Sequence, residues 1–259
     1  MPASLLVAAA IGLAAGFLSG QFGIGGGLVT TPAIRLILGQ PELIAVGTPL
    51  PVVIPTALAG AWAYWRRGLV DVRTGLLTGL LGGVFAIGGA LVSDVLGGTA
   101  VLVITAAVIL WTAVDMIGGI IHPEKMVVDR EMHLRRKHSW PWIIGLAVVA
   151  GLYSGLLGLG GGLIITPALT RFFGHDIKRA IGTSLVAVTV LAVPGTIAHY
   201  YLGHVDVGIA LALIVGVVPG ALLGARVTMH AKDRSVRIGF AALLLVAGAV
   251  LAATEIGLF

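Results

Sequence analysis

The chain has 259 residues, of which 58% are hydrophobic and only 10% are charged, and its mean hydropathy is +1.08. Soluble domains carry roughly 25% charged residues because their surfaces face water, so this composition excludes an ordinary soluble enzyme and predicts an integral membrane protein. In such a protein the excess of 16 Lys and Arg over 11 Asp and Glu sets the orientation of the chain and is no sign of nucleic-acid binding, and the absence of Cys excludes disulfides and thiolate metal sites.

Stretches without Asp, Glu, Lys or Arg predict the elements that cross the membrane. Six of the eight stretches are near the roughly 20 residues that span a bilayer as a helix. The other two have 34 and 32 residues, and each contains a glycine cluster. In chain order the stretches are Met1–Ile34, Leu43–Trp65, Thr74–Ser93, Val95–Val114, Ser139–Thr170, Ala180–Val205, Val207–Ala225 and Ile238–Thr254.

The two long stretches are predicted to fold back on themselves. As a single helix, Met1–Leu38 would be roughly 57 Å long, whereas the hydrocarbon core of a bilayer is about 30 Å thick. The glycines predict the reversal at Phe22–Gly26 in the first stretch. In the second stretch, Trp140–Phe173, they predict it at Leu157–Gly161.

An internal repeat divides the chain into two halves. When the chain is shifted by 135 residues, Gly16–Ala90 aligns with Gly151–Ala225 without a gap, and about 28 of the 75 aligned positions are identical. This alignment is called the repeat register below. It predicts a first membrane repeat at residues 1–121, a polar linker at 122–138 and a second membrane repeat at 139–259.

The basic residues indicate that the two repeats are inverted. They lie in loops that are not equivalent, since Arg66 and Arg67 correspond to Tyr201 and Leu202 in the repeat register. If all basic loops are cytoplasmic, the second repeat is flipped relative to the first. We therefore expect an all-α polytopic membrane protein with two inverted repeats, each a Gly-broken helical hairpin plus three transmembrane helices. The linker would be cytoplasmic and both termini periplasmic.

The repeated glycine motif is the candidate site. It reads Gly23-Ile-Gly-Gly-Gly27 with Thr31-Pro32, and Gly158-Leu-Gly-Gly-Gly162 with Thr166-Pro167. Adjacent glycines break a helix, and the helix that restarts after them presents its N-terminus, which attracts anions. The alternative is that these glycines only allow close helix packing. Their occurrence in both halves favours the anion site.

The doubled motif, the number of apolar segments and the length resemble the TauE/SafE sulfite exporter family, also called the 4-toluene sulfonate uptake permeases. This resemblance covers nearly the whole chain. It implies a transporter of the inner membrane that carries sulfite, sulfonates or related organosulfur anions.

Polar residues inside the spans complete the candidate site, because such residues are costly in a membrane and are often functional. Threonines that recur at equivalent positions are the best candidates, although each alone can bond its own helix backbone. His199 is interpreted as an anion ligand, a proton carrier or a packed core histidine. The predicted substrate-binding residues are Gly25, Gly26, Gly27, Thr31, Thr48, Gly160, Gly161, Gly162, Thr166, Thr183, Ser184 and His199.

These features predict a secondary transporter of small sulfur-containing anions, such as sulfite or the organosulfonate sulfoacetate, that works by alternating access. Uniport and proton-coupled transport both remain open, as do a monomer and a homodimer. No nucleotide motif or metal cluster is visible in the sequence, so we expect no cofactor, no metal, no catalysis and no nucleic-acid partner. The alternatives are a transporter of another small organic anion, such as a carboxylate, and a membrane assembly or scaffold protein.

Overall fold

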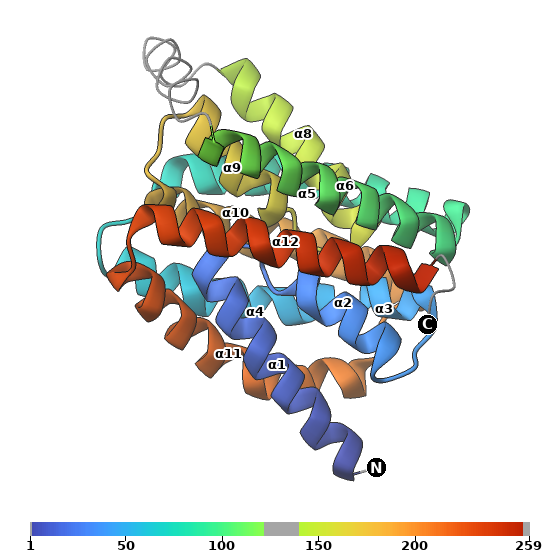
Figure 1. Ribbon diagram of the computed structural model, residues 1–259. Helices are drawn as coiled ribbons and strands as arrows, with labels where there is room; N and C mark the ends of the chain where they lie inside the picture. Colours follow the sequence, from blue (N-terminus) through green and yellow to red (C-terminus); the bar gives the residue numbers. More distant parts are fainter. Residues whose placement is uncertain (1, 122–139, 256–259) are drawn as a thin grey trace.

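The computed structural model describes residues 2–121 and 140–255, and all the regular structure in these two segments is helical (Figure 1). The first half contains α1 (Pro2–Phe22), α2 (Gly27–Leu36), α3 (Glu42–Gly47), α4 (Pro49–Trp65), α5 (Val72–Leu96) and α6 (Gly98–Ile121). The second half contains α8 (Trp140–Leu157), α9 (Gly162–Phe172), α10 (Ile177–Tyr201), α11 (Val207–His230) and α12 (Asp233–Glu255). The predicted linker at 122–138 lies outside the described residues.

Seven helical segments of the described chain are long and apolar enough to cross a membrane. Together with the composition, they confirm the predicted all-α, multi-pass membrane fold. The candidate spans are Glu42–Trp65, Val72–Leu96, Gly98–Gly118, Trp140–Leu157, Ile177–Tyr201, Val207–His230 and Asp233–Ala253.

Both long apolar stretches are broken where the glycines predict it. The first helix ends at Phe22 and α2 begins at Gly27, while α8 ends at Leu157 and α9 begins at Gly162. Gly26, which precedes α2, has a φ of 94°, a conformation that side chains with a Cβ rarely adopt. The backbone conformation therefore explains why glycine interrupts the helices at these points.

Small residues allow two helix pairs to pack very closely. Helix α1 packs along α11, and α8 packs along α5. A Cβ on Gly16 would lie only 2.3 Å from the Val217 carbonyl oxygen, and a Cβ on Gly155 only 1.9 Å from that of Ala86. Close backbone contact of this kind replaces the hydrophobic effect, which does not drive association between helices inside lipid.

Helices that are equivalent in the repeat register make equivalent contacts. Helices α1 and α5 of the first half pack on α11 and α8 of the second half, and these two pairs exchange when the halves are exchanged. Helices α6 and α12 are equivalent to each other and lie side by side. Figure 1 shows α6 (green) and α12 (red) running in opposite directions. The contacts between the halves thus follow a two-fold pattern.

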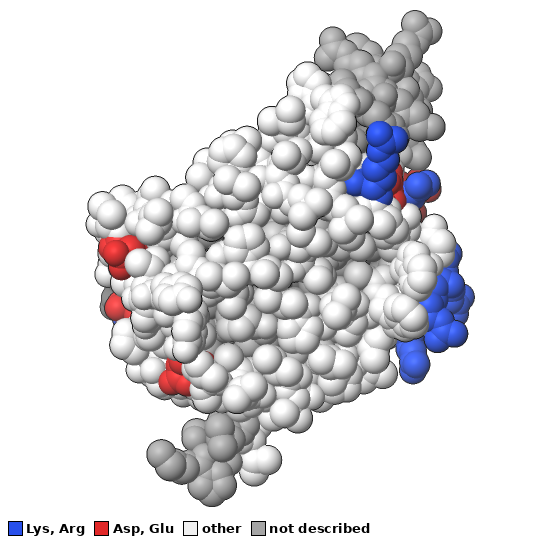
Figure 2. Space-filling model, turned by 180° about the vertical axis from the view of Figure 1, so that it is seen from behind, with Lys and Arg blue, Asp and Glu red and all other residues white. Residues whose placement is uncertain are grey.

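Charged side chains lie at the two ends of the helical bundle. In Figure 2, Lys and Arg gather at one end, and Asp and Glu are prominent at the opposite end. At the basic end the ammonium of Lys178 lies 3.6 Å from the Asp233 carboxylate, which joins the start of α10 to the start of α12. At the acidic end Arg35 is paired with Glu42. The face between the two ends is almost free of charge, as expected of a surface in contact with lipid.

Candidate functional site

The residues between the broken helices form two loops, Gly23–Gly26 and Gly158–Gly161, called the glycine loops below. Each loop meets the start of the short helix that follows the other loop. A Cβ on Gly27 would lie 2.7 Å from the Leu159 Cα, and a Cβ on Gly162 would lie 2.2 Å from the Gly23 carbonyl oxygen. The structure therefore brings the two sets of predicted glycines together, and no larger residue fits at Gly27 or Gly162.

Each glycine loop ends in a helix N-terminus without a side-chain cap. Gly26 and Gly161 are the N-cap residues of α2 and α9, both in the left-handed conformation. The first N–H groups of a helix have no partner within that helix, and the aligned peptides place about half a positive charge at this end. Two such ends, buried in the protein, are suited to an anion.

Two equivalent valines pack against both loops. A Cβ on Gly25 would lie 2.9 Å from a Val188 methyl carbon and 3.0 Å from a Val53 methyl carbon. A Cβ on Gly160 would lie within 3.2 Å of the same two side chains. Val53 and Val188 lie at the middle of the spans Glu42–Trp65 and Ile177–Tyr201. The glycine loops are thus placed halfway along the long helices.

Two predicted hydroxyl groups of the second half bond to the first glycine loop and its preceding helix. The Ser184 hydroxyl donates to the Gly23 carbonyl at 3.1 Å, and the Thr166 hydroxyl donates to the Phe22 carbonyl at 3.5 Å. Both side chains are fully buried. These two hydrogen bonds hold the first glycine loop and the end of α1 against the second half.

The predicted pair Thr48 and Thr183 joins the halves through one repeated hydrogen bond. The Thr48 hydroxyl oxygen accepts from the backbone N–H of Asp206 at 3.0 Å. The Thr183 hydroxyl oxygen accepts from the backbone N–H of Asp71 at 2.8 Å. Both Asp residues then cap the helix that follows, α11 or α5. The sequence predicted that these threonines bind the anion. In the structure their hydroxyl oxygens accept hydrogen bonds from the backbone N–H groups of loop residues.

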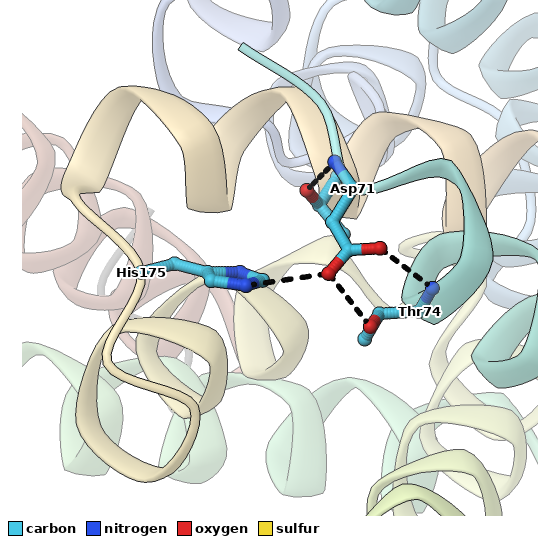
Figure 3. A network of polar contacts seen from close by, with 4 residues as sticks. Asp71, Thr74 and His175 are labelled. Carbon is cyan, nitrogen blue, oxygen red and sulfur yellow. Dashed lines mark hydrogen bonds and ion pairs between the residues drawn. The ribbon is translucent and has the colours of Figure 1, made fainter. Parts of the chain in front are cut away.

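Asp71 lies in a small polar network at the basic end of the bundle (Figure 3). Its carboxylate accepts from the backbone N–H of Thr74 at 3.1 Å and from the Thr74 hydroxyl at 3.0 Å, and lies 3.5 Å from His175 Nε2. The hydrogen bond to His175 lowers the pKa of Asp71 well below its usual range, against the opposing effect of burial. Asp71 is therefore held as a carboxylate at neutral pH.

Three buried serine and threonine hydroxyls in the helices that flank the loops have no hydrogen-bond partner among the described atoms. They belong to Thr31, one of the predicted residues, and to Ser19 and Ser154, which are fully buried. A Cβ on Gly26 would lie 3.9 Å from the Ser19 Cβ. Sequence reasoning missed both serines. They are identical in the repeat register and lie four residues before the glycine motif, so the repeat could have identified them.

His199 is buried in the last turns of α10, where it contacts a backbone carbonyl and a second histidine. Its Nε2 lies 2.7 Å from the Gly155 carbonyl oxygen, and its Nδ1 lies 3.2 Å from Nδ1 of His204. Tyr64, its equivalent in the first half, donates its hydroxyl to the equivalent Gly20 carbonyl at 3.0 Å. One role of this position is therefore to hold α1 and α8.

A separate apolar groove of about 400 Å³ lies between α10 and α11, and its lining includes Pro51, Ile197 and Leu211. It is distinct from the glycine loops and offers mainly hydrocarbon surface. No group of three or more potential metal ligands occurs among the described residues.

The comparisons with known proteins identify the family. The model of the sulfite exporter TauE/SafE family matches residues 8–251. The chain belongs to this family. The family resemblance expected from the glycine motifs is thereby confirmed.

Curated relatives are named as membrane transporters. The probable membrane transporter protein YunE of Bacillus subtilis is 27% identical over 259 residues, which cover 90% of this chain and 92% of that protein. A probable membrane transporter protein of Methanocaldococcus jannaschii is 26% identical over 253 residues, covering 92% and 91%. One from Xylella fastidiosa is 29% identical over 223 residues, covering 85% and 84%. The comparison with solved structures found no match. Family and relatives together support a membrane transporter.

Proposed function

We propose that the protein carries small sulfur-containing anions, such as sulfite and organosulfonates including sulfoacetate, and binds them between the two glycine loops. The observation that carries this proposal is the meeting of two uncapped helix N-termini beside buried hydroxyls without partners. Backbone N–H and hydroxyl groups donate to oxyanions without a fixed buried cation. The anion is then held weakly enough to leave again.

The two-fold contact pattern suggests how such a site opens to each side in turn. Val53 and Val188 lie against both loops, so an anion reaches the backbone amides only when α4 or α10 moves. Because the halves are equivalent, the same movement in one half or the other would open the site toward opposite ends. We infer an alternating-access secondary transporter built from two inverted repeats.

The charge distribution supports an orientation in the inner membrane. Basic side chains gather at one end of the bundle, and basic loops face the cytoplasm in most membrane proteins. We therefore infer that the linker at 122–138 is cytoplasmic and that both termini are periplasmic. Reporter fusions at Arg136 and at the C-terminus test the orientation, and a cytoplasmic C-terminus beside a cytoplasmic linker contradicts it.

The substrate proposal is tested with hydroxyl deletions that remove no existing hydrogen bond. Ser19→Ala, Ser154→Ala and Thr31→Val leave the fold intact, because these hydroxyls have no partner among the described atoms. If they donate to the anion, each deletion weakens binding about tenfold, the usual loss for one hydrogen bond to a charged group. The measurement is the stabilisation of the purified protein by sulfite, sulfoacetate and methanesulfonate against thermal unfolding.

Thr105→Val is the matched control, because the Thr105 hydroxyl is buried in α6 and bonds only the Val101 carbonyl of its own helix. It should leave anion binding unchanged. Stabilisation by acetate or succinate but by no sulfur anion would assign a carboxylate transporter instead. A protein stabilised by no anion would favour the scaffold alternative.

A further inference from the structure

A line of three ionisable side chains leads from the acidic end of the bundle toward the second glycine loop. Asp94 lies near the end of α5, His204 in the turn between α10 and α11, and His199 within α10. The Asp94 carboxylate lies 3.1 Å from His204 Nε2, and the two histidine Nδ1 atoms lie 3.2 Å apart. The exposed fraction falls inward, from 47% for the Asp94 side chain to 7% for that of His204 and 0% for His199.

The hydrogen bonds of this triad require one more proton than two neutral histidines supply. The Gly155 carbonyl can only accept, so Nε2 of His199 carries the hydrogen of the 2.7 Å contact. A hydrogen bond between the two Nδ1 atoms needs one further hydrogen, and a hydrogen bond between His204 Nε2 and Asp94 needs a third. Two neutral histidines carry only two N–H groups. With all three contacts hydrogen-bonded, the third hydrogen would be an added proton that balances the charge of Asp94.

We propose that Asp94, His204 and His199 form a proton-binding site that couples anion transport to proton movement. This inference rests on the proposed function. The added proton can reside on Asp94, on His204 or on His199, and shifts along the line by passing across the Nδ1–Nδ1 contact. It enters from the exposed carboxylate and stops at His199. Beyond His199 the line ends at a carbonyl oxygen, which accepts a hydrogen bond but passes no proton onward.

The inner end of the line lies where a positive charge favours an anion at the loops. Gly155 is in the last turn of α8, and the second glycine loop begins three residues later. A cation is stabilised at a helix C-terminus by the helix dipole. A proton on His199 therefore adds positive charge beside the site while the anion is bound. Its return to Asp94 weakens that attraction.

The equivalent positions of the first half provide a built-in comparison. In the repeat register His199 and His204 correspond to Tyr64 and Leu69 of the first half. Tyr64 makes the equivalent hydrogen bond to Gly20 without any partner that titrates near neutral pH. The fold therefore needs the bond to the helix carbonyl, but not the second histidine. The histidine pair occurs in the second half only and meets Asp94 of the first half.

Other charged groups near the triad are already engaged. Gly47 of α3 packs on the backbone of His204, and Glu42 at the start of the same helix is paired with Arg35. Asp206, two residues after His204, accepts from the Ile209 N–H and caps α11. Of the charged side chains described on these elements, Glu42 and Asp206 already have other partners. We therefore assign the added proton to the triad.

The coupling is tested with variants that copy the first half, His199→Tyr and His204→Leu. The purified protein is placed in liposomes with labelled methanesulfonate, whose sulfonate stays ionised throughout the working pH range. The wild type should accumulate the anion when the side of Asp94 is acidic, about tenfold per pH unit for one proton per anion. His204→Leu should retain anion exchange at equal pH within about twofold, and both variants should lose accumulation. Accumulation by either variant at the wild-type level overturns the proposal.

A second measurement does not depend on the substrate. Nitrogen NMR of histidine-labelled protein at about pH 6 counts the N–H groups of His199 and His204. Three are expected in the wild type and two in Asp94→Asn, with coupling between the two Nδ1 atoms in both. Two N–H groups in the wild type, together with an ionised Asp94 carboxylate in carbon NMR, overturn the proton site. Absence of methanesulfonate exchange by the wild type, with three N–H groups present, counts against the proposed substrate instead.

Discussion

The Thr183 hydroxyl oxygen accepts a hydrogen bond from the backbone N–H of Asp71 at 2.8 Å, which fastens α10 of the second half to the turn before α5 of the first. The bond between Thr48 and Asp206 repeats this contact with the halves exchanged. Two bonds at opposite ends thus hold the halves together around the glycine loops. They define where the halves are joined and where movement has to occur.

Thr48→Val and Thr183→Val should each lower the free energy of unfolding by about 1–3 kcal/mol, because each leaves a backbone N–H without its partner. The two losses should add, since the bonds are distant and share no atoms. Unfolding of the purified variants in detergent checks this. Thr112→Val, which removes only a bond within α6, is the control. Equal stability of control and test variants would show that these contacts do not join the halves.

Stability should depend on acid through Asp71. Its pKa is lowered in the folded protein by the hydrogen bond from His175. Because the pKa is lower in the folded protein, ionised Asp71 stabilises the fold at any pH above its pKa in the unfolded chain, about 3.9. This stabilisation is lost as the pH falls toward the pKa in the folded protein. Asp71→Asn keeps a capping side chain and removes the charge, so it should destabilise the protein more at pH 7 than at about pH 3, where part of the charge contribution has been lost. An equal effect at both pH values contradicts this.

Close packing through glycine should make two positions intolerant of a single methyl group. Gly16→Ala and Gly155→Ala place a Cβ within 2.3 Å of a carbonyl oxygen on the facing helix, so both should cost more than about 2 kcal/mol or prevent folding. Gly145→Ala in α8 has no atom within 4 Å and should be neutral or stabilising by up to about 1 kcal/mol. Expression and thermal stability of the three variants make the comparison.

Gly26→Ala separates the proposed binding role from packing. The nearest atom to a Cβ there is a Thr56 methyl at 3.7 Å, so the cost comes from the φ of 94° and is about 1–2 kcal/mol. The methyl group would project toward Ser19 and Thr56, into the space proposed for the anion. Anion binding should fall at least tenfold while the protein remains folded.

Gly39→Ala is the matched control for this variant. Gly39 has a φ of 64° and no atom within 4 Å of a Cβ, so it carries a similar backbone strain away from the loops. Its anion binding should stay at the wild-type level. Equal loss in both variants would assign the effect to instability, and normal binding by Gly26→Ala would remove the loop from the site.

The sequence predicted much of this architecture, because its signals are local or repeated. Charge-free stretches located the spans, and adjacent glycines located both helix breaks. The repeat register also paired Thr48 with Thr183, whose hydrogen bonds prove to be equivalent. These patterns are properties of the chain itself, and they do not depend on which segments meet in space.

Contacts between the halves were beyond the sequence pattern. Nothing in the sequence indicated that the Thr183 oxygen would accept from Asp71, or that His204 would lie between His199 and Asp94. Each of these contacts joins different helices or loops, and hydrogen-bond partners across a fold have no fixed spacing. Buried serines were a partial exception, since Ser19 and Ser154 are identical in the repeat register and were overlooked among the glycines.

The most direct test of the central claim is to locate a bound anion. A crystal structure with 2-bromoethanesulfonate, recorded at the bromine absorption edge, would mark the ligand without reference to any variant. The account predicts one bromine peak between α2 and α9, with the sulfonate within hydrogen-bond distance of the first amides of α2 or α9, from Gly27 or Gly162 onward. A peak only in the groove between α10 and α11, or only among the Lys and Arg at the basic end, would contradict it.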